Sequence, residues 1–360
     1  RIATLTLGSK VANIGYRAFY NCSGLKTLTI PNSVTYMDSD VFQNCTRLTS
    51  VTMGTGLKAI PSDAFAGCEN LKSVTIGANV TQMGSSAFSG CKSLSSITWG
   101  KKLSIIGGSA FYKCAALTKL TIPNTVTEIG SSAFDECTGL TSLTLGNKLA
   151  SIGSYAFQDC TGIPSLVLPA SVKELDYRSF YGCTGLKSVT IGTGITEIPS
   201  DAFRNCTSLD TVRLGENLTR IGDNAFAGCT ALKNLIWGNK LRIIAGSAFG
   251  GCTALRVVSL PDSVTTLGNS AFYNCGALSS LRLSKNLTEI GSSAFEKCAF
   301  LTKVRIPENV TDIGSYAFRN CTSLKTVYLP ESLQVIGYSA FRSCNALSNL
   351  YYESDEEDIE

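Results

Sequence analysis

The chain has 360 residues, with 31 Lys and Arg against 27 Asp and Glu and no histidine. At 44% hydrophobic and 16% charged residues, the composition is that of a globular protein with a sizeable core and not of a disordered chain. Without histidine there is no Ser–His or Cys–His nucleophile, no stretch approaches the roughly 20 apolar residues of a membrane helix, and a net charge of +4 does not indicate a nucleic-acid partner.

The chain enters its first expected element directly. Ile2, Leu5 and Leu7 occupy the positions of a strand, with no polar segment before them. The terminal units of repeat proteins normally need a polar cover. We therefore expect the chain to be a piece of a longer protein or a form trimmed at its start.

Cysteine then recurs every 23 residues. Fifteen cysteines run from Cys22 to Cys344 without an insertion or deletion, and fifteen of the sixteen phenylalanines lie three residues before a cysteine, Phe300 being out of phase. Length alone would suggest two or three compact domains. Strict periodicity instead predicts a linear array of one structural unit, because one unit cannot bury its apolar side without a stacked neighbour.

Each repeat is expected to contain one strand and one tight turn. In the repeat after Cys114, residues 117–122 read Leu-x-x-Leu-x-Ile, a period-2 pattern typical of a strand with one buried face, and Pro123 ends it. Val126 and Ile129 form a second apolar step. Residues 131–140 follow, in which serines can cap a turn and the apolar residues share one face of a short helical or 3₁₀ segment: Ser131, Ser132, Ala133, Phe134, Cys137 and Leu140.

The complete pattern, C-x-x-L-x-x-I-x-I-P-x-x-V-x-x-I-G-x-x-A-F-x-x-C, resembles the BspA-like leucine-rich repeat over about residues 2 to 352. The resemblance implies one α/β solenoid domain over residues 1–352. It would be a right-handed horseshoe or arc of about 15 units, with a parallel sheet on the concave face and short helical or 3₁₀ turns on the other side. One departure is the position of the ladder asparagine after the strand, which varies: Ser33, Gly56, Asn79, Lys102 and Thr125.

A longer period overlies the short one. Three pairs of residues are each 138 residues, or six repeats, apart: Trp99 and Trp237, Pro61 and Pro199, Asp38 and Asp176. Because three uncommon features share one offset, duplication of a six-repeat block is favoured over coincidence.

The chain closes with an acidic segment. Six of the eight residues 353–360 are acidic. Such a run is typical of a solvated tail. It also resembles, together with Tyr351 and Tyr352, the Tyr-Tyr and acidic close that follows the last unit in this family, which would make residues 353–360 a cap.

The cysteines allow four interpretations. An odd number at uniform spacing argues against a disulfide framework, side chains that point in parallel do not suit the disulfide torsion, and a straight ladder cannot wrap four thiolates around zinc. A catalytic thiol would lack a histidine partner. The favoured interpretation is a ladder of small buried free thiols beside a stacked phenylalanine column.

The remaining motifs do not indicate a phosphate-binding or catalytic site. Gly54-Thr55-Gly56 and Gly192-Thr193-Gly194 are turn glycines without a phosphate-loop motif after them. Eight N-x-[ST] sequons arise from the repeat itself and do not by themselves indicate glycosylation: Asn21, Asn44, Asn79, Asn205, Asn217, Asn286, Asn309 and Asn320. No carboxylate pair indicates an acid–base couple, and we expect no enzyme activity, cofactor or metal.

A binding function would lie on the outward strand positions, five and seven residues after each cysteine. The plus-seven column is mostly threonine up to Thr190 and then changes to Arg213, Ile236, Ser259, Arg282, Arg305, Tyr328 and Tyr351. Arg and Tyr are enriched at binding hot spots. We therefore expect a ligand-binding patch on the C-terminal part of the concave face: Arg213, Arg282, Lys303, Arg305, Tyr328, Asn349 and Tyr351.

The family resemblance implies a secreted or cell-surface binding or adhesion module, whose partner would be a protein of the extracellular matrix or of another cell surface. A carbohydrate-binding surface module and a structural spacer in a larger surface protein are the alternatives. Trp99 and Trp237 favour the glycan alternative only superficially, because both occupy an inward strand position. No nucleic-acid partner and no membrane insertion of this chain are expected.

Overall fold

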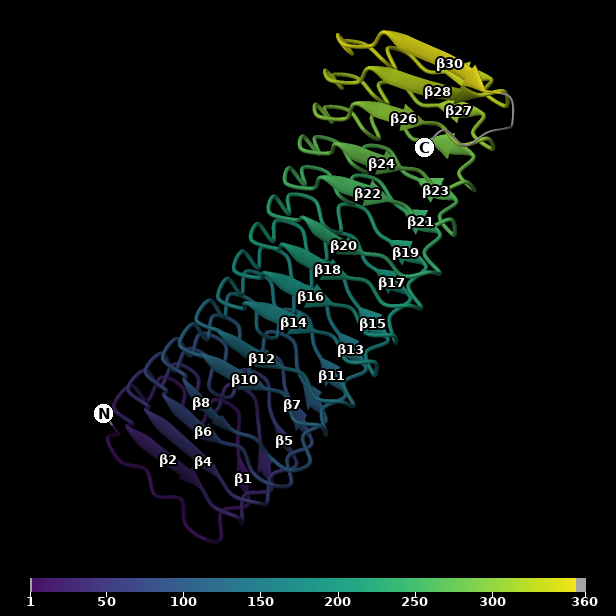
Figure 1. Ribbon diagram of the computed structural model, residues 1–360. Helices are drawn as coiled ribbons and strands as arrows, with labels where there is room; N and C mark the ends of the chain where they lie inside the picture. The colour runs from purple at the N-terminus through teal and green to yellow at the C-terminus, as the bar shows by residue number, and fades with distance from the viewer. Residues whose placement is uncertain (1, 354–360) are drawn as a thin grey trace. The chain divides into compact units, whose positions relative to one another are not determined.

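The structure is a computed structural model that describes residues 2–353. The chain forms a solenoid of about 15 turns with parallel strands, organised as two compact units, Arg1–Leu186 and Lys187–Glu360. Each 23-residue turn, here called a coil, contributes a first strand shortly after its cysteine and a short second strand about ten residues later (Figure 1). The expectation of a leucine-rich-repeat solenoid with a parallel sheet is confirmed.

The N-terminal unit contains the strands β1 to β15. Its first strands are β2 Thr27–Ile30, β4 Ser50–Met53, β6 Ser73–Thr75, β8 Ser96–Thr98, β10 Lys119–Thr121, β12 Ser142–Thr144 and β14 Ser165–Val167. Its second strands are β1 Asn13–Ile14, β3 Tyr36–Met37, β5 Ala59–Ile60, β7 Gln82–Met83, β9 Ile105–Ile106, β11 Glu128–Ile129, β13 Ser151–Ile152 and β15 Glu174–Leu175.

The C-terminal unit contains the strands β16 to β30. Its first strands are β16 Ser188–Thr190, β18 Thr211–Arg213, β20 Asn234–Ile236, β22 Val257–Ser259, β24 Ser280–Arg282, β26 Lys303–Arg305, β28 Thr326–Pro330 and β30 Asn349–Glu353. Its second strands are β17 Glu197–Ile198, β19 Arg220–Ile221, β21 Ile243–Ile244, β23 Thr266–Leu267, β25 Glu289–Ile290, β27 Asp312–Ile313 and β29 Val335–Ile336.

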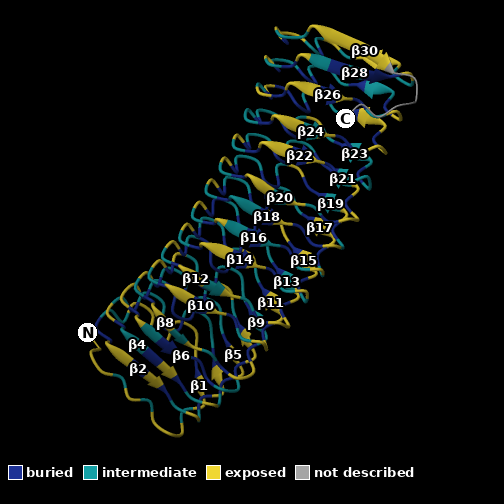
Figure 2. Cartoon of the chain, in the orientation of Figure 1, coloured by how far each residue is buried: buried dark blue, intermediate teal, exposed yellow. Residues whose placement is uncertain are grey.

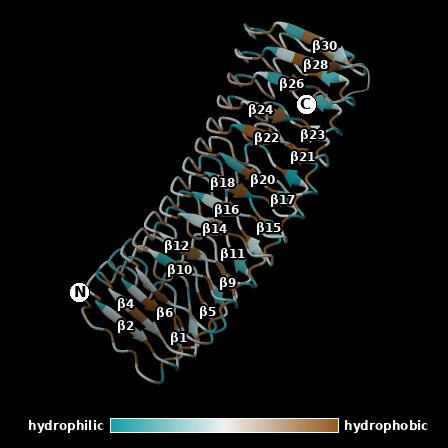
Figure 3. Ribbon diagram, in the orientation of Figure 1, coloured by the Kyte–Doolittle hydropathy of each residue, from teal (hydrophilic) through white to brown (hydrophobic). Residues whose placement is uncertain are grey.

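Constant coil length fixes the register of both strand series. Leu120 of β10 lies opposite Leu143 of β12, and Ile129 of β11 lies opposite Ile152 of β13, so each residue pairs with its own copy 23 positions away. Since side chains alternate along a strand, this register collects one repeat position into one column. The central residue of a first strand faces the core, as Leu120 does between two exposed neighbours. Figure 2 shows buried and exposed segments along the coils, and Figure 3 shows hydrophobic segments among hydrophilic ones.

The expected helical or 3₁₀ turns are wrong: the described residues contain no helix. Ser132 and Glu136, five residues and one residue before Cys137, have φ of 55° and 57°, and the same two positions are left-handed in every coil. The N–H groups of Ser132 and Phe134 donate to the next coil, to Ser154 O and Ala156 O at 2.8 Å each, whereas that of Asp135 donates to Ser132 O at 3.1 Å. A segment whose amides bond alternately to itself and to its neighbour cannot form the uniform i→i−4 ladder of a helix.

Phenylalanine and cysteine form the two core columns that the sequence predicts. Neighbouring Phe rings in each unit are stacked with centroids 5.1 to 5.6 Å apart and planes within 12° of parallel. All fifteen cysteines are free thiols, and all but Cys22 are buried. Cys137 Sγ donates to Phe111 O at 3.2 Å, a bond that recurs from coil to coil and occupies a carbonyl oxygen of the neighbouring coil.

Three further expectations concern the two ends of the chain and the variable asparagine position after each first strand. The strand expected at Ile2, Leu5 and Leu7 is absent, since β2 pairs with β4 alone among the described strands. At the variable ladder position, four asparagines donate their side-chain amide to a backbone carbonyl of the preceding coil at 2.7 to 2.9 Å: Asn79, Asn217, Asn286 and Asn309. Of the acidic tail or cap expected at residues 353–360, Glu353 ends β30, and residues 354–360 lie outside the described residues.

The tryptophans pack inward against the phenylalanine column. Trp99 lies edge-on to Phe111 with ring centroids 5.8 Å apart, and Trp237 lies in the same way against Phe249 at 5.7 Å. Both indoles are partly buried. They therefore extend the core rather than offering a platform on the strand face.

Candidate functional site

The seven residues expected to bind a ligand all lie on first strands of the C-terminal unit. Arg282, Lys303, Arg305, Asn349 and Tyr351 are exposed, and Tyr328 is half-buried. Their strands present these side chains outward because the intervening residues, such as Val304 of β26, enter the core. We call Arg282, Lys303, Arg305, Tyr328 and Tyr351 the strand-face patch.

The centre of the patch is a stack of cations and tyrosine rings. Arg305 lies opposite Tyr328, and Tyr328 lies opposite Tyr351, in the register of β26, β28 and β30. The Arg305 guanidinium carbon is 4.7 Å from the Tyr328 ring centroid, and Lys303 Nζ is 4.9 Å from it. The Tyr328 and Tyr351 rings are 5.3 Å apart and 26° from parallel. These cation–π and ring contacts fix the side chains before any ligand arrives.

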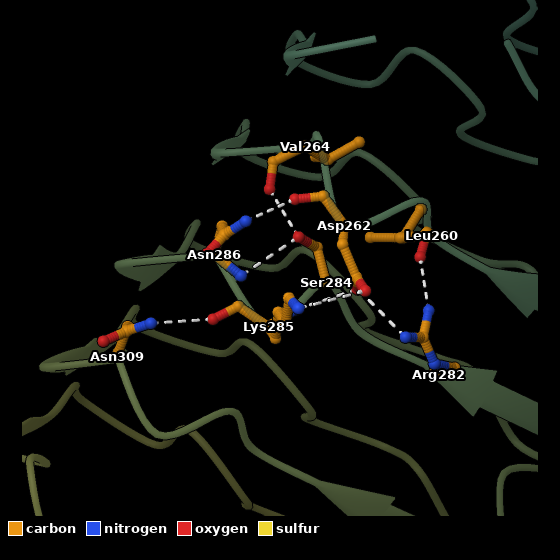
Figure 4. A network of polar contacts seen from close by, with 8 residues as sticks. All are labelled: Leu260, Asp262, Val264, Arg282, Ser284, Lys285, Asn286 and Asn309. Carbon is orange, nitrogen blue, oxygen red and sulfur yellow. Dashed lines mark hydrogen bonds and ion pairs between the residues drawn. The ribbon is translucent and has the colours of Figure 1, made fainter. Parts of the chain in front are cut away.

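Arg282 is held by a neighbouring carboxylate. Its Nη1 donates to Leu260 O and its Nη2 to Asp262 Oδ1, each at 2.9 Å (Figure 4). Lys285 Nζ lies 3.9 Å from the other oxygen of Asp262. Arg282 therefore contributes an oriented donor to the patch, with much of its charge balanced by Asp262.

A backbone and side-chain network supports Asp262 from the next coil. Ser284 Oγ, fully buried, donates to Val264 O at 2.6 Å and accepts from Asn286 N at 3.2 Å, and Asn286 Nδ2 donates to Asp262 O at 2.7 Å (Figure 4). Desolvation alone would raise the Asp262 pKa, but donation from Lys285 N–H and the charge of Arg282 outweigh it, so this pKa lies below its ordinary value. The carboxylate that orients Arg282 thus stays ionised.

Two of the expected residues stand apart from this centre. Arg213 on β18 pairs with Ile236 on β20, so strands β20 and β22 separate it from Arg282 on β24. Asn349 lies opposite Thr326 at the near end of β30, beside the patch but outside the ring stack. Sequence reasoning missed Asp262, which lies in the turn after β22, three positions after Ser259, the residue that pairs with Arg282.

The C-terminal unit also has a shallow groove along its second strands. About 290 Å³ of space is lined by residues of β23, β25 and β27 and the glycines that follow them, and its polar side chains are Thr266, Asn269, Glu289, Ser292 and Asp312. Two of the lining glycines, Gly268 and Gly291, leave no room for a side chain, which would collide with the backbone of the preceding coil. The outward columns of the first strands do not include this surface.

Tyrosines gather at the turns of both units, which sequence reasoning also missed. In the N-terminal unit, Tyr155 and Tyr177 meet edge to face at 5.5 Å, and the Arg178 guanidinium lies 4.9 Å from Tyr177 and from Tyr181. Their signal in the sequence is the recurrence of tyrosine two, five or six residues before a cysteine.

Metal ligation and membrane insertion concern two further kinds of site. Within residues 2–353, no group of three or more Cys, Asp and Glu residues is arranged to hold a metal ion. In the same part of the chain, no helix has the length and apolar character that crossing a bilayer requires.

Several solved structures of leucine-rich-repeat proteins are similar to this chain. A leucine-rich-repeat protein from Bacteroides ovatus is 28% identical with a TM-score of 0.76, over 94% of this chain and 82% of that one. A leucine-rich cell surface protein from Faecalibacterium prausnitzii is 27% identical with a TM-score of 0.42, over 99% and 87% of the two chains. The pneumococcal vaccine antigen PcpA is 22% identical with a TM-score of 0.48, over 92% and 82%. No curated protein matches the chain.

The family model is more specific than these structural likenesses. The model of the BspA type leucine-rich repeat region, which spans six copies, matches residues 1–118, 104–233 and 219–349. These matches cover nearly the whole chain and follow the 23-residue period of its coils. The chain belongs to the BspA-type leucine-rich-repeat family.

Proposed function

We propose that this protein is a non-enzymatic binding or adhesion module, secreted or held at a cell surface, that engages a protein ligand through the strand-face patch. The observation that carries the proposal is the stack of Lys303 and Arg305 on Tyr328, followed by Tyr351, on three adjacent strands. Proteins of this repeat family are generally surface or binding proteins.

The composition of the patch supports a protein ligand. Tyr and Arg supply large contact areas and directional donors, and they dominate the energetic centres of protein interfaces. The ring stack is already ordered, so binding loses less side-chain entropy than it would with isolated long side chains. The Thr-rich strand faces of the N-terminal unit, such as Thr121 of β10, lack this combination.

The test is binding of the whole chain to immobilised collagen, laminin and fibronectin and to cultured epithelial cells, measured by surface plasmon resonance and flow cytometry. An Arg305→Glu, Tyr328→Ala double variant should weaken binding by at least about tenfold, because it removes the cation and the ring at the centre of the stack. Lys119→Glu, an exposed residue of the same kind of strand position in the N-terminal unit, is the matched control and should leave affinity unchanged.

The experiment tests the location of the binding site and the adhesion function separately. Binding that survives the double variant would overturn the assignment to the strand-face patch. Absence of binding by the unaltered chain to all four surfaces would overturn the adhesion function and favour a structural spacer.

A further inference from the structure

Phe300 is the one phenylalanine that lies outside the buried column. It follows Cys298 by two residues, at a position that holds Gly, Ala or Ser in twelve of the other fourteen coils. Phe300 is 66% exposed, whereas the column phenylalanines from Phe42 to Phe318 are at most 1% exposed. The fold therefore does not need a ring at this position. Because single exposed apolar residues are common on protein surfaces, the surroundings of Phe300 decide whether it has a role.

The ring of Phe300 stands on a fixed loop with open flanks. Phe300 N donates to Gly276 O at 3.3 Å, which joins its loop to the preceding coil. On the other side, Ser323 N donates to Ala299 O at 3.1 Å. The residues at the same position in the coils before and after are Ala277 and Ser323, and neither side chain is large enough to cover the ring. Among residues 2–353, none makes an aromatic or cation–π contact with it.

The segments beside Phe300 carry cations and no acidic residue. No Asp or Glu occurs from the cysteine to the plus-seven position of three adjacent coils: residues 275–282, 298–305 and 321–328. Lys303 and Lys325 of these segments are exposed, and no described carboxylate lies within ion-pair distance of either ammonium group. Glu296, the acidic residue closest before Phe300 in the chain, is buried and lies 3.8 Å from Arg319. This surface therefore combines an exposed ring with two uncompensated positive charges.

Lys303 and Lys325 lie beside the loop that carries Phe300. Lys325 N donates to Thr302 O at 2.8 Å, and Thr302 precedes Lys303 in the chain. Three peptide units separate Phe300 from Lys303, so their Cα atoms are at most about 11 Å apart. Lys303 Nζ lies 4.9 Å from the ring centroid of Tyr328 and so connects this surface to the strand-face patch. We call Phe300, Lys303 and Lys325 the Phe300 edge.

We propose, in an inference that rests on the proposed function, that the Phe300 edge binds an acidic segment of the protein ligand with an apolar side chain between its carboxylates. The apolar side chain packs against the Phe300 ring, and the carboxylates pair with Lys303 and Lys325. Burial of an exposed aromatic ring supplies affinity, whereas complementary charge supplies specificity and a faster encounter. The rest of the same ligand covers the strand-face patch.

A protein segment fits this surface better than an anionic lipid bilayer does. Lys303 Nζ lies over the Tyr328 ring on the strand face, so a ligand that meets this charge also lies along the strands. Phe300 is the one large apolar side chain among the three coils at its position, because its flanking residues are Ala277 and Ser323. Stable attachment to a bilayer needs more apolar surface than one ring.

The experiment measures binding of a fluorescein-labelled peptide, Gly-Asp-Glu-Leu-Asp-Glu-Gly, to the whole chain by fluorescence anisotropy at low salt. The unaltered chain should bind it at least about fivefold more tightly than the same peptide with Ser in place of Leu, because Leu covers the ring. A peptide with Asn and Gln in place of Asp and Glu should bind at least about tenfold more weakly than the acidic peptide, because it lacks the carboxylates.

Phe300→Ser tests the ring directly. This variant should bind the Leu and Ser peptides with affinities within about twofold of each other, since removing either partner abolishes their coupling. Serine is the residue at this position in the next coil, Ser323, so the variant should fold, which circular dichroism checks. Val167→Ser is the matched control: Val167 is 65% exposed on β14 of the N-terminal unit, and its replacement should leave the preference for the Leu peptide unchanged.

Failure of the unaltered chain to bind the Leu peptide would overturn the proposal, and so would an equal preference for Leu in Phe300→Ser and the unaltered chain. Binding to phosphatidylserine vesicles that Phe300→Ser abolishes, without binding of the peptide, would assign this surface to a lipid instead. The proposed function is tested separately with the matrix proteins and cells. If Arg305→Glu, Tyr328→Ala weakens that binding and Phe300→Ser does not, the strand-face patch stands and the Phe300 edge is not part of it.

Discussion

The cysteine column shows what one residue type contributes when it recurs in every coil. A thiol is small enough for the tight space beside the phenylalanine rings, and its weak S–H donor still reaches a backbone carbonyl, as Cys137 Sγ reaches Phe111 O at 3.2 Å. Burial raises the pKa of Cys137 to about 12, so this side chain stays a neutral thiol at physiological pH. Because thiolates are the reactive form, Cys137 contributes to the protein through packing.

A buried carboxyl group near this column has a measurable consequence. Asp135 is 8% exposed, and its Oδ1 has no hydrogen-bond partner. Burial, followed by the charges of Glu136 and Asp159, raises its pKa to about 6, against the opposing effects of the Glu136 backbone N–H and the Lys113 charge. The folded state therefore holds this proton more tightly than the unfolded state does, and the associated stability is complete below about pH 4 and lost as pH rises to about 6.

We expect Asp135→Asn to stabilise the protein at pH 7 by on the order of 1 kcal/mol, because the amide cannot ionise in this position. The difference from the unaltered protein should vanish at pH 3.5. Urea unfolding followed by circular dichroism at both pH values measures it. A stabilisation of equal size at both pH values would show that ionisation is not its cause.

At the scale of the element, strands and turns differed in how far they could be predicted. The alternation in Leu117–Ile122 and the constant period determine strand, register and buried face together, because a slip by one residue would expose the whole apolar set. The turn was predicted wrongly as helical, since Ala133, Phe134 and Cys137 show the spacing of one helix face. The competing signal is the frequent Ser, Asn, Asp and Gly at the two left-handed positions, which tolerate positive φ.

The candidate functional residues could likewise be predicted on the strands but not in the turns. Members of the strand-face patch could be identified from the sequence because strand columns map directly onto one exposed face. The ion pair between Arg282 and Asp262 could not be predicted. Asp262 lies in a turn of the preceding coil, and the sequence did not give the geometry of that turn. The contact between Tyr155 and Tyr177 was missed for the same reason, because a helical turn would have pointed these side chains in other directions.

The turn geometry can be tested with neighbouring serines. Ser132→Val places a β-branched residue at φ 55° and should destabilise the protein by about 1–3 kcal/mol. Ser131→Val, at an exposed position without positive φ, is the matched control and should change stability by less than about 0.5 kcal/mol. Urea midpoints compare the two. If both substitutions had equal effects, the left-handed conformation at residue 132 would not be what limits the choice of side chain.

At the scale of the whole molecule, the fold depends on every coil having the same length. Each coil contacts its neighbours through identical columns, so stability in such arrays is close to a sum over coils and their interfaces. Because no residue inside one coil is needed to define the register of distant coils, an entire coil is dispensable, whereas a fraction of one is not.

Two deletions in the N-terminal unit test this dependence. Removing residues 119–141 deletes 23 residues and joins Thr118 to Ser142, which keeps Leu143 three positions after Leu117; we expect a folded protein that is less stable by about 1–3 kcal/mol. Removing residues 120–141 deletes one residue fewer and shifts Leu143 to an outward position. That variant should be at least about 2 kcal/mol less stable than the first, because the strand either exposes its leucines or bulges. Urea unfolding of both variants measures the difference, and equal stabilities would show that the coils tolerate a change of length and that the period is not enforced by packing.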